Sequence, residues 1–219
     1  MLRRLFGAVD APAPCKYLGS VMSDSAATQL NRLQWPEIAL VGRSNVGKSS
    51  LINALVKHPV ARCSKTPGRT RRAHMFSLGD AAILVDLPGY SFAKGPREDL
   101  EEMSTCIAEL SLLRDESALA RVLMLCDARR GGLMHADWNM LAALADKGIG
   151  VDVVLTKVDR LSRTAASALV KDVGTRLSPY EATVVGTSCR DNVGIDGVRV
   201  LLAKAVERFA SRCSSHLKK

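Results

Sequence analysis

The stretch GRSNVGKS at residues 42–49 decides how the rest of this chain is interpreted. It matches the phosphate-binding pattern G-x-x-x-x-G-K-[ST] at every fixed position. The apolar run EIALV at residues 37–41 precedes it and is typical of a short buried strand. Leu51, Ile52 and Leu55 follow it at helical spacing. We therefore expect the loop to run from a strand into a helix whose N-terminus faces an anion.

The chemistry of this loop follows from its residue types. Its glycines let successive backbone N–H groups point at an anion, Lys48 adds a positive charge for the β- and γ-phosphates, and the Ser49 hydroxyl can bind Mg²⁺. The alternative is a glycine-rich turn that ends in Lys-Ser by chance, which we expect in roughly one per cent of chains of this length. The residues predicted to bind the nucleotide phosphates are Gly42, Ser44, Asn45, Val46, Gly47, Lys48, Ser49 and Ser50.

A second motif predicts which base is bound. The apolar run VDVVL at residues 151–155 is followed by Thr156-Lys157-Val158-Asp159. Ligands bind at the carboxyl ends of strands in an open α/β sheet, and a carboxylate there can accept two hydrogen bonds from guanine. Adenine lacks that pair of donors, so a desolvated Asp159 would disfavour ATP. The Lys157 stem can lie along the base, and Thr187, Ser188 and Cys189, after another strand, can complete the pocket through backbone N–H groups and the Ser188 hydroxyl.

A third motif supplies the magnesium site and a switch. The run AAILV at residues 81–85 leads into Asp86-Leu87-Pro88-Gly89, so Asp86 is predicted to hold Mg²⁺ and the Gly89 N–H to reach the γ-phosphate. A strand capped by an ordinary Asp/Pro/Gly turn is the alternative. The loop at residues 62–70 has the composition of a first switch segment, in which either Thr66 or Thr70 completes the Mg²⁺ shell when GTP is bound.

With these motifs in this order, the chain resembles the EngB family of bacterial GTPases. The motifs that carry the resemblance are GRSNVGKSSLIN, SKTPGRT, DLPGY, TKVD and the later Thr-Ser pair. The resemblance covers about residues 35–209. It implies a Ras-like domain that hydrolyses GTP as a switch in assembly of the large ribosomal subunit. It also implies that the protein is needed for normal cell division and septation. It also implies that Gly68 and Thr70 belong to the nucleotide and Mg²⁺ site, and that Lys48, Gly89 and Asn45 take part in hydrolysis.

The chain departs from the family pattern at several positions. Ser91 stands where the family usually has glycine, Arg71-Arg72 follow the switch threonine in place of a polar amide, and Cys189 replaces a second serine. Ras-type GTPases place a water-orienting glutamine where this chain has Tyr90, so we expect slow intrinsic hydrolysis. Related GTPases without this glutamine use an asparagine at the position of Asn45 to hold K⁺, so K⁺ stimulation is one hypothesis. A purely structural role for Asn45 in the loop is the other.

Composition limits the class of partner. The formal net charge is +9 in 219 residues, which favours a polyanion, and basic residues gather around the first switch and in the last helix and tail. Aromatic residues are only 4%, so we expect phosphate-led binding of rRNA in a large-subunit precursor, together with its proteins, and no base-stacking platform. We expect neither DNA nor a membrane as partner. The six cysteines form no C-x-x-C pair, and Cys106 and Cys126 lie in apolar patterns, which predicts free thiols in a cytoplasmic protein.

Alternating strands and helices predict a three-layer α/β fold with a mostly parallel six-stranded sheet and one antiparallel edge strand. We expect a flexible tail at residues 1–16, a single GTPase domain at 17–211 and a basic tail at 212–219, in a monomer. A P-loop kinase or ATPase, and a nucleotide-stabilised rRNA-binding scaffold with negligible turnover, are the alternatives. The predicted strands are 37–42, 72–78, 81–86, 121–127, 151–156 and 182–187, and the predicted helices are 47–57, 98–113, 136–147, 164–177 and 194–210.

Overall fold

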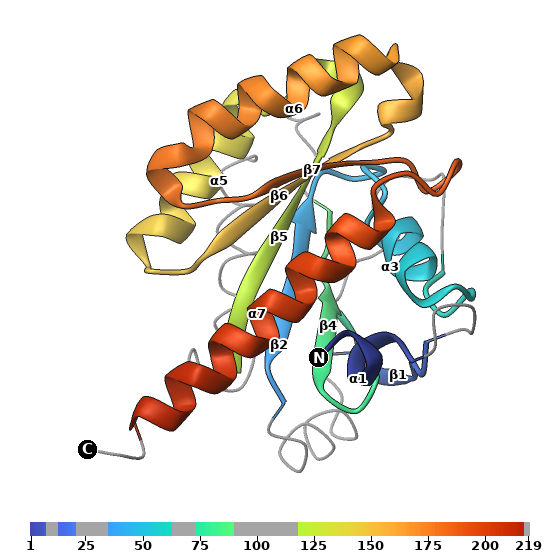
Figure 1. Ribbon diagram of the computed structural model, residues 1–219, viewed down its shortest axis with the longest axis vertical. Helices are drawn as coiled ribbons and strands as arrows, with labels where there is room; N and C mark the ends of the chain where they lie inside the picture. The colour runs from blue at the N-terminus through green and yellow to red at the C-terminus, as the bar shows by residue number, and fades with distance from the viewer. Residues whose placement is uncertain (8–12, 21–34, 63–72, 90–117, 217–219) are drawn as a thin grey trace.

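A mixed β-sheet organises the structure, a computed structural model that describes residues 1–7, 13–20, 35–62, 73–89 and 118–216 (Figure 1). Within these residues the sheet has seven strands in the order β1-β3-β4-β2-β5-β6-β7. The strands are β1 (Tyr17–Ser20), β2 (Glu37–Gly42), β3 (His74–Leu78), β4 (Ala82–Asp86), β5 (Leu119–Asp127), β6 (Val151–Thr156) and β7 (Val184–Thr187). The helices longer than one turn are α1 (Leu2–Phe6), α3 (Lys48–Val56), α5 (His135–Asp146), α6 (Arg163–Leu177) and α7 (Ile195–His216).

The pairing of the strands confirms the predicted fold class and corrects the strand count. Strands β4, β2, β5, β6 and β7 pair in parallel, while β3 runs antiparallel to β4 through the tight turn at Gly79. The predicted single strand of opposite direction is confirmed as β3, but the predicted count of six strands becomes seven, because β1 pairs with the outer side of β3. β1 has four residues and a register shift between Tyr17 and Gly19, so it has no clear alternating pattern for sequence analysis to find.

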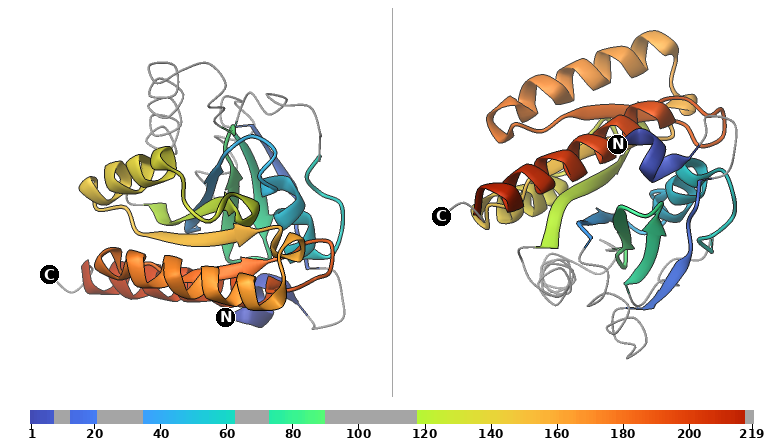
Figure 2. Two further views of the ribbon diagram at one scale, coloured as in Figure 1. Left: turned by 90° about the horizontal axis from the view of Figure 1, so that it is seen from above. Right: turned by 60° about the horizontal axis from the view of Figure 1, so that its bottom comes forward.

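The sheet is covered on both faces. Along β2, Ile38 and Leu40 join one apolar cluster with α1, α3 and α7, whereas Ala39 and Val41 join a second cluster with α5 and α6. This alternation explains why the strand appears as a continuous apolar run, since both of its faces are buried. Figure 2 shows the helices on either side of the sheet. The carboxyl ends of the parallel strands are thereby left at one edge of the sheet.

Both predicted tails are corrected by the structure. Residues 2–6 form α1, where Leu5 is fully buried and Phe6 nearly so, which differs from the expected flexible tail. Residues 13–20 then run along β3, and the backbone N–H groups of Ser77 and Gly79 donate to Lys16 and Pro14 at 2.9 and 2.7 Å. At the other end α7 continues to His216, so the predicted tail at 212–219 begins inside a helix.

One side chain of α7 supports the helix that follows the phosphate-binding loop. Arg199 donates to the carbonyl of Leu55, near the end of α3, through Nη2 at 2.7 Å and Nε at 3.1 Å. Its guanidinium also lies 5.4 Å from the centre of the Phe6 ring of α1. Cationic donors at a helix C-terminus satisfy its free carbonyls and complement its dipole. Arg199 therefore fixes α1, α3 and α7 together.

Most other boundaries agree with the sequence predictions to within one or two residues. The predicted helix at 98–113 and the segment at 63–72 lie outside the described residues. Cys126 is buried with a free thiol, as predicted, while Cys106 falls outside the described part of the chain. No helix of the described residues is both long and apolar enough to cross a membrane.

Candidate guanine nucleotide site

The phosphate-binding loop joins β2 to α3, as its sequence predicts. Gly42 has φ of 150°, and a Cβ there would lie 2.6 Å from the Leu125 carbonyl oxygen of β5, so only glycine fits. Asn45 and Gly47 also have positive φ, of 60° and 121°. Three such residues within six positions turn the chain sharply before Lys48 begins the helix. The N-terminus of α3 therefore opens into the loop, which is the geometry of an anion-binding site.

Lys48 and Gly89 meet across this loop. The Lys48 side chain is largely buried, and its Nζ donates to the Gly42 carbonyl at 3.1 Å. The Ser44 hydroxyl donates to the Gly89 carbonyl at 3.0 Å. A Cβ at Gly89 would lie 2.9 Å from Lys48 Nζ and 2.8 Å from the Ser44 Cα, so no side chain fits there. The structure thus brings together two of the residues expected to act in hydrolysis, from β4's end and from the loop.

The two described candidates for Mg²⁺ binding are in contact. The Ser49 hydroxyl donates to Asp86 Oδ2 at 2.8 Å, whereas the buried Oδ1 has no hydrogen-bond partner in the described part of the chain. Burial raises the pKa of Asp86, and the opposing effects of Lys48, Ser49 and His74 only reduce that shift. A hydroxyl, a buried carboxylate and an unpartnered oxygen suit a hard cation such as Mg²⁺. These residues therefore fit the ion that the sequence predicts.

The base motif after β6 is tied directly to the phosphate-binding loop. The Thr156 hydroxyl donates to the Val46 carbonyl at 2.8 Å and lies 3.2 Å from the Cys126 carbonyl. Lys157, in a left-handed conformation with φ of 61°, donates through Nζ to the Asn45 carbonyl at 2.8 Å. The loop is held by these contacts to the carboxyl end of β6. The part of the site predicted for the base and the part predicted for the phosphates are consequently one connected unit.

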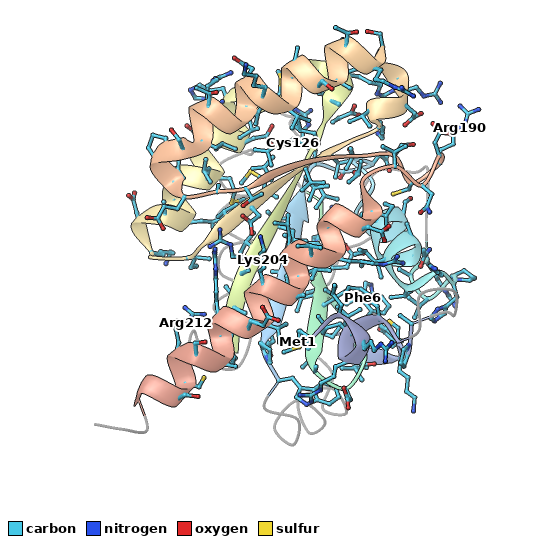
Figure 3. The ribbon with its side chains drawn as sticks, in the orientation of Figure 1. Met1, Phe6, Cys126, Arg190, Lys204 and Arg212 are labelled. Atoms are coloured by element: carbon cyan, nitrogen blue, oxygen red, sulfur yellow. The ribbon has the colours of Figure 1, made fainter. Side chains whose placement is uncertain are left out.

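Asp159 and Ser188 line the same cavity, of about 520 Å³. Asp159 forms an ion pair with the neighbouring Arg160 at 3.3 Å, and its side chain is 9% exposed. The Ser188 N–H donates to the Val193 carbonyl, and its hydroxyl accepts from the Asp191 N–H at 3.1 Å. The Ser188 N–H is thus used inside the turn, while its hydroxyl keeps its own proton to donate. Arg190, from the same turn, projects outward from the body of the molecule (Figure 3).

The described candidates gather at one edge of the sheet. Paired strands place Asp127 beside Thr156, and Thr156 beside Thr187, at the carboxyl ends of β5, β6 and β7. Ser50 lies in the first turn of α3, and Cys189 is partly buried after β7. The sequence candidates outside the described residues are Thr66, Gly68 and Thr70, together with Arg71, Arg72, Tyr90 and Ser91.

Sequence analysis missed two side chains at this site. Asn53 of α3 accepts from the Val60 and Ala61 N–H groups at 3.0 and 2.8 Å, and so holds the chain that leads toward the predicted first switch. An asparagine inside a helix is a weak helix former, which is the signal that could have indicated another role. Asp127, at the end of β5, contacts both Lys157 and Arg129. A carboxylate that follows a buried strand at this edge was the available signal.

Asp127 is strongly stabilised as a carboxylate. Burial by itself would raise its pKa, but hydrogen bonds from Arg129 and Lys157 outweigh burial and hold the pKa well below its usual range. The same contacts raise the pKa of Arg129. Asp127 is therefore a fixed negative charge beside Lys157 at all pH values near neutral.

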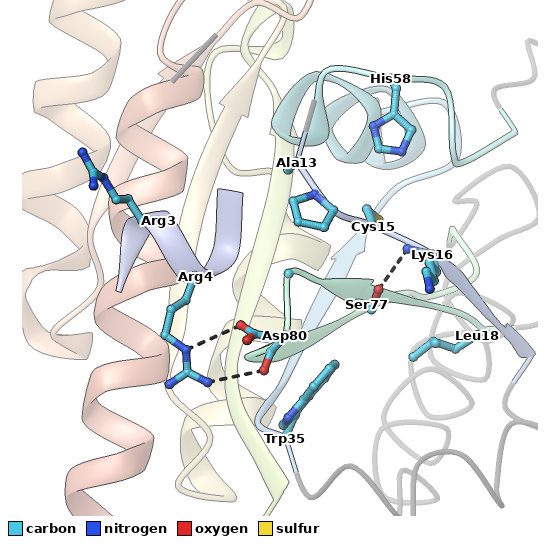
Figure 4. Close-up of a pocket in the computed structure, with 12 residues that line it drawn as sticks. Arg3, Arg4, Ala13, Cys15, Lys16, Leu18, Trp35, His58, Ser77 and Asp80 are labelled. Atoms are coloured by element: carbon cyan, nitrogen blue, oxygen red, sulfur yellow. Dashed lines mark hydrogen bonds and ion pairs between the residues drawn. The ribbon is translucent and has the colours of Figure 1, made fainter. Parts of the chain in front are cut away.

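A second cavity, of about 1020 Å³, lies at the opposite end of the sheet (Figure 4). It is formed by α1, the segment around Pro14 and the β3–β4 turn, and Trp35 lies at its lower side. Ser77 accepts from the Lys16 N–H at 2.9 Å, and Arg4 pairs with Asp80 on an exposed surface. None of the nucleotide-site candidates lines this cavity. This cavity is thus separate from the predicted chemistry.

Comparison with known proteins agrees with this geometry. Residues 37–157 match a family model described as "50S ribosome-binding GTPase". The probable GTP-binding protein EngB of Sinorhizobium fredii is 38% identical over 185 residues, which cover 78% of this chain and 84% of that protein.

Two solved structures share the fold. A crystal structure of a probable GTP-binding protein EngB has a TM-score of 0.61 at 21% identity and covers 78% of this chain and 99% of that one. NFeoB from S. thermophilus, bound to GDP, AlF4⁻ and K⁺, has a TM-score of 0.53 at 25% identity and covers 80% of this chain and 61% of its own. The family model spans more than half of this chain, and the relative from S. fredii is similar along most of its length. The chain is therefore a GTPase of the EngB family of GTP-binding proteins.

Proposed function

We propose that this GTPase acts as a GTP-dependent switch in the assembly of the large ribosomal subunit. The observation that carries the proposal is the match of residues 37–157, which include the phosphate-binding loop and Asp86, to a family described as 50S ribosome-binding GTPases. In this role the GTP form docks on an immature particle and hydrolysis to GDP releases it. Slower growth and impaired division on loss of the protein then follow from a shortage of ribosomes. We propose the cytoplasm as the compartment in which the protein acts.

The contacts between the phosphate-binding loop and Gly89 support a switch. Gly89 is the last described residue before segment 90–117, and it lies against Ser44 and Lys48. Asp86, three residues earlier, contacts Ser49. A γ-phosphate and Mg²⁺ in this site would contact the loop, Asp86 and Gly89 together. In our proposal Ser49, Asp86 and Thr70 hold Mg²⁺, which neutralises charge on the phosphates, while Lys48 and the Gly89 N–H stabilise the transferred group.

The exposed face of α7 supports contact with rRNA. Lys204, Arg208 and Arg212 are exposed and recur at intervals of four residues, which places them on one face of the helix. Lys204 and Arg212 mark the ends of this row in Figure 3. The row continues the predicted basic surface at the C-terminal end of the chain. Binding through such residues is expected to be phosphate-led and sensitive to salt.

Cosedimentation with large-subunit precursors under GTP, GDP and a non-hydrolysable analogue tests the proposal. We expect binding with GTP and the analogue, and release with GDP. The Asp159→Asn variant sharpens the test, because its pocket should prefer xanthine nucleotides, so XTP and no longer GTP should drive its binding. Equal binding in all nucleotide states would refute the switch. An unchanged base preference in Asp159→Asn would refute the guanine pocket separately.

The basic face can be tested on its own. We expect Arg208→Glu with Arg212→Glu to weaken particle binding and to flatten its dependence on salt. Lys147→Glu with Arg176→Glu, which reverses two exposed charges away from α7 and from the nucleotide site, is the matched control and should bind as the unmodified protein does. Equal losses in both variants would show a general effect of net charge and would remove α7 from the proposal.

Hydrolysis is expected to be slow without a partner, because Tyr90 stands where Ras-type GTPases have glutamine. We propose that K⁺ beside Asn45 accelerates it, as a fold neighbour, NFeoB, was crystallised with K⁺ and a phosphate-transfer analogue. Single-turnover hydrolysis in KCl and NaCl at matched ionic strength, with and without ribosomal particles, tests this. Equal rates of GTP hydrolysis in both salts would refute the K⁺ hypothesis. No turnover in any condition would favour the alternative, an rRNA-binding scaffold stabilised by nucleotide.

A further inference from the structure

Asp127 occupies a central position among the strand ends of the nucleotide site. It is the last residue of β5, lies beside Thr156 of β6 in the sheet, and is 8% exposed. Its carboxylate accepts from Lys157 Nζ at 2.9 Å. The same carboxylate accepts from Arg129 through Nε at 2.9 Å and Nη2 at 2.7 Å. Such charge-assisted hydrogen bonds hold both partners in defined positions.

The Lys157 ammonium has a second anchor in the phosphate-binding loop. It donates to the Asn45 carbonyl at 2.8 Å, so the ammonium lies between the end of β5 and the loop. A lysine side chain has four flexible torsions, and its position is costly to fix with one hydrogen bond. With two anchors the lysine stem has a set path from its backbone, which is itself in a left-handed conformation. Asp127 supplies the only carboxylate among the hydrogen bonds described for this ammonium.

We propose that Asp127 is a positioning residue for guanine nucleotides, acting through Lys157. Its carboxylate holds the lysine stem along the plane of the base and, by the same ammonium, keeps the Asn45 carbonyl turned away from the phosphates. Loss of this carboxylate frees the ammonium and loosens both ends of the nucleotide site. The expected result is faster dissociation of GDP and GTP alike. This inference rests on the assignment of Lys157 to the guanine pocket.

A purely local role for Asp127 is the competing explanation. Its Oδ1 also accepts from the Arg129 N–H at 3.1 Å, which caps the short helix η2 (Ala128–Arg130). Asparagine can keep this cap, because its side-chain oxygen accepts the same hydrogen bond and its shape is nearly the same. It removes the charge and replaces the oxygen that accepts from Lys157 and from Arg129 Nη2 with an NH₂ group, which cannot accept. The Asp127→Asn variant therefore separates positioning of the lysine from capping of η2.

The test measures release of a fluorescent GDP analogue chased with excess GDP, in the full-length protein. We expect Asp127→Asn to raise the dissociation rate about tenfold, which corresponds to about 1.4 kcal/mol. Lys157→Met, which keeps the stem and removes the ammonium, should raise the rate by a similar factor. The double variant should be no faster than Lys157→Met alone, because both changes remove the same interaction. Arg129→Gln leaves the pair of Asp127 and Lys157 intact, so it should stay within about threefold of the unmodified protein.

The outcomes are distinguishable. A dissociation rate within twofold of the unmodified protein in folded Asp127→Asn would overturn the proposal. So would a double variant that dissociates faster than Lys157→Met by the same factor that Asp127→Asn shows alone. An effect of Arg129→Gln as large as that of Asp127→Asn would assign the role to Arg129 instead. Should Lys157→Met alone leave the rate unchanged, the guanine pocket is misassigned and the proposal falls with it. Asp127→Ser, which also keeps a capping oxygen, gives the same comparison if the asparagine variant does not fold.

Discussion

Replacement of Thr156 by valine tests whether the phosphate-binding loop is preorganised by the sheet. The Thr156 side chain is buried at the end of β6, and its hydroxyl donates to the Val46 carbonyl at 2.8 Å. The Cys126 carbonyl lies at 3.2 Å from the same oxygen. Valine has nearly the same shape and suits a strand, so the change removes one donor and little else. Val46 belongs to the loop itself, so the loss falls directly on the site.

The expected magnitude follows from this geometry. Removal of the donor from a buried hydrogen bond, with its acceptor left in place, costs about 1–3 kcal/mol. Part of that loss appears in the free energy of unfolding. Another part appears in binding, because a loosened loop must be ordered again when the phosphates bind. If about 1–1.4 kcal/mol falls on binding, the affinity for GDP decreases about five- to tenfold.

Two measurements on the same variant separate these parts. Equilibrium titration with GDP in the presence of Mg²⁺ gives the affinity, and denaturant unfolding without nucleotide gives the stability. Thr175→Val is the control, since Thr175 lies exposed on α6 and its hydroxyl donates to the Lys171 carbonyl at 3.1 Å. We expect the control to leave GDP affinity unchanged. An affinity for GDP within twofold of the unmodified protein, together with a clear loss of stability, would show that Thr156 serves only the core and would refute the reasoning.

Three further predictions concern stability and closure of the site. Asp152→Ala should lower the unfolding free energy by about 3 kcal/mol, because it leaves the largely buried Arg121 guanidinium without its carboxylate partner and with only carbonyl acceptors, whereas Asp172→Ala on the surface should change it by less than about 1 kcal/mol. Arg199→Ala should cost about 1–3 kcal/mol in denaturant unfolding, since it removes the donors at the end of α3. Gly89→Ala should slow single-turnover GTP hydrolysis more than tenfold with GDP affinity nearly unchanged, because the new Cβ would contact Ser44 and Lys48 of the phosphate-binding loop. An unchanged rate of hydrolysis would show that the loop can shift to accommodate the methyl group.

The parts of the fold that sequence analysis predicted are those with a local physical signal. Strands β2 and β6 are buried on both faces and appear as largely apolar runs. The phosphate-binding loop has glycines at positions that backbone geometry requires, since Gly42 and Gly47 both have positive φ. Such features are decided within a few residues, so the sequence pattern alone is enough.

The parts that were missed are decided by tertiary contacts. β1 is a strand because β3 offers it an open edge, and its own four residues have little strand character. α1 is five residues long and is held by burial of Leu5 and Phe6. The role of Asp127 was missed, since its partner Lys157 lies 30 residues away. No local pattern reports contacts of this range.

The contacts at the carboxyl edge of the sheet divide the nucleotide site into a fixed part and a part able to respond. Thr156 and Lys157 hold the loop carbonyls of Val46 and Asn45 to β6, and Arg199 holds the far end of α3. The base and most of the phosphates would therefore meet one rigid surface in both the GTP and the GDP forms. The γ-phosphate alone distinguishes these forms. We therefore expect the difference between them to be transmitted at Gly89, which touches the loop and leads directly into the segment that follows it.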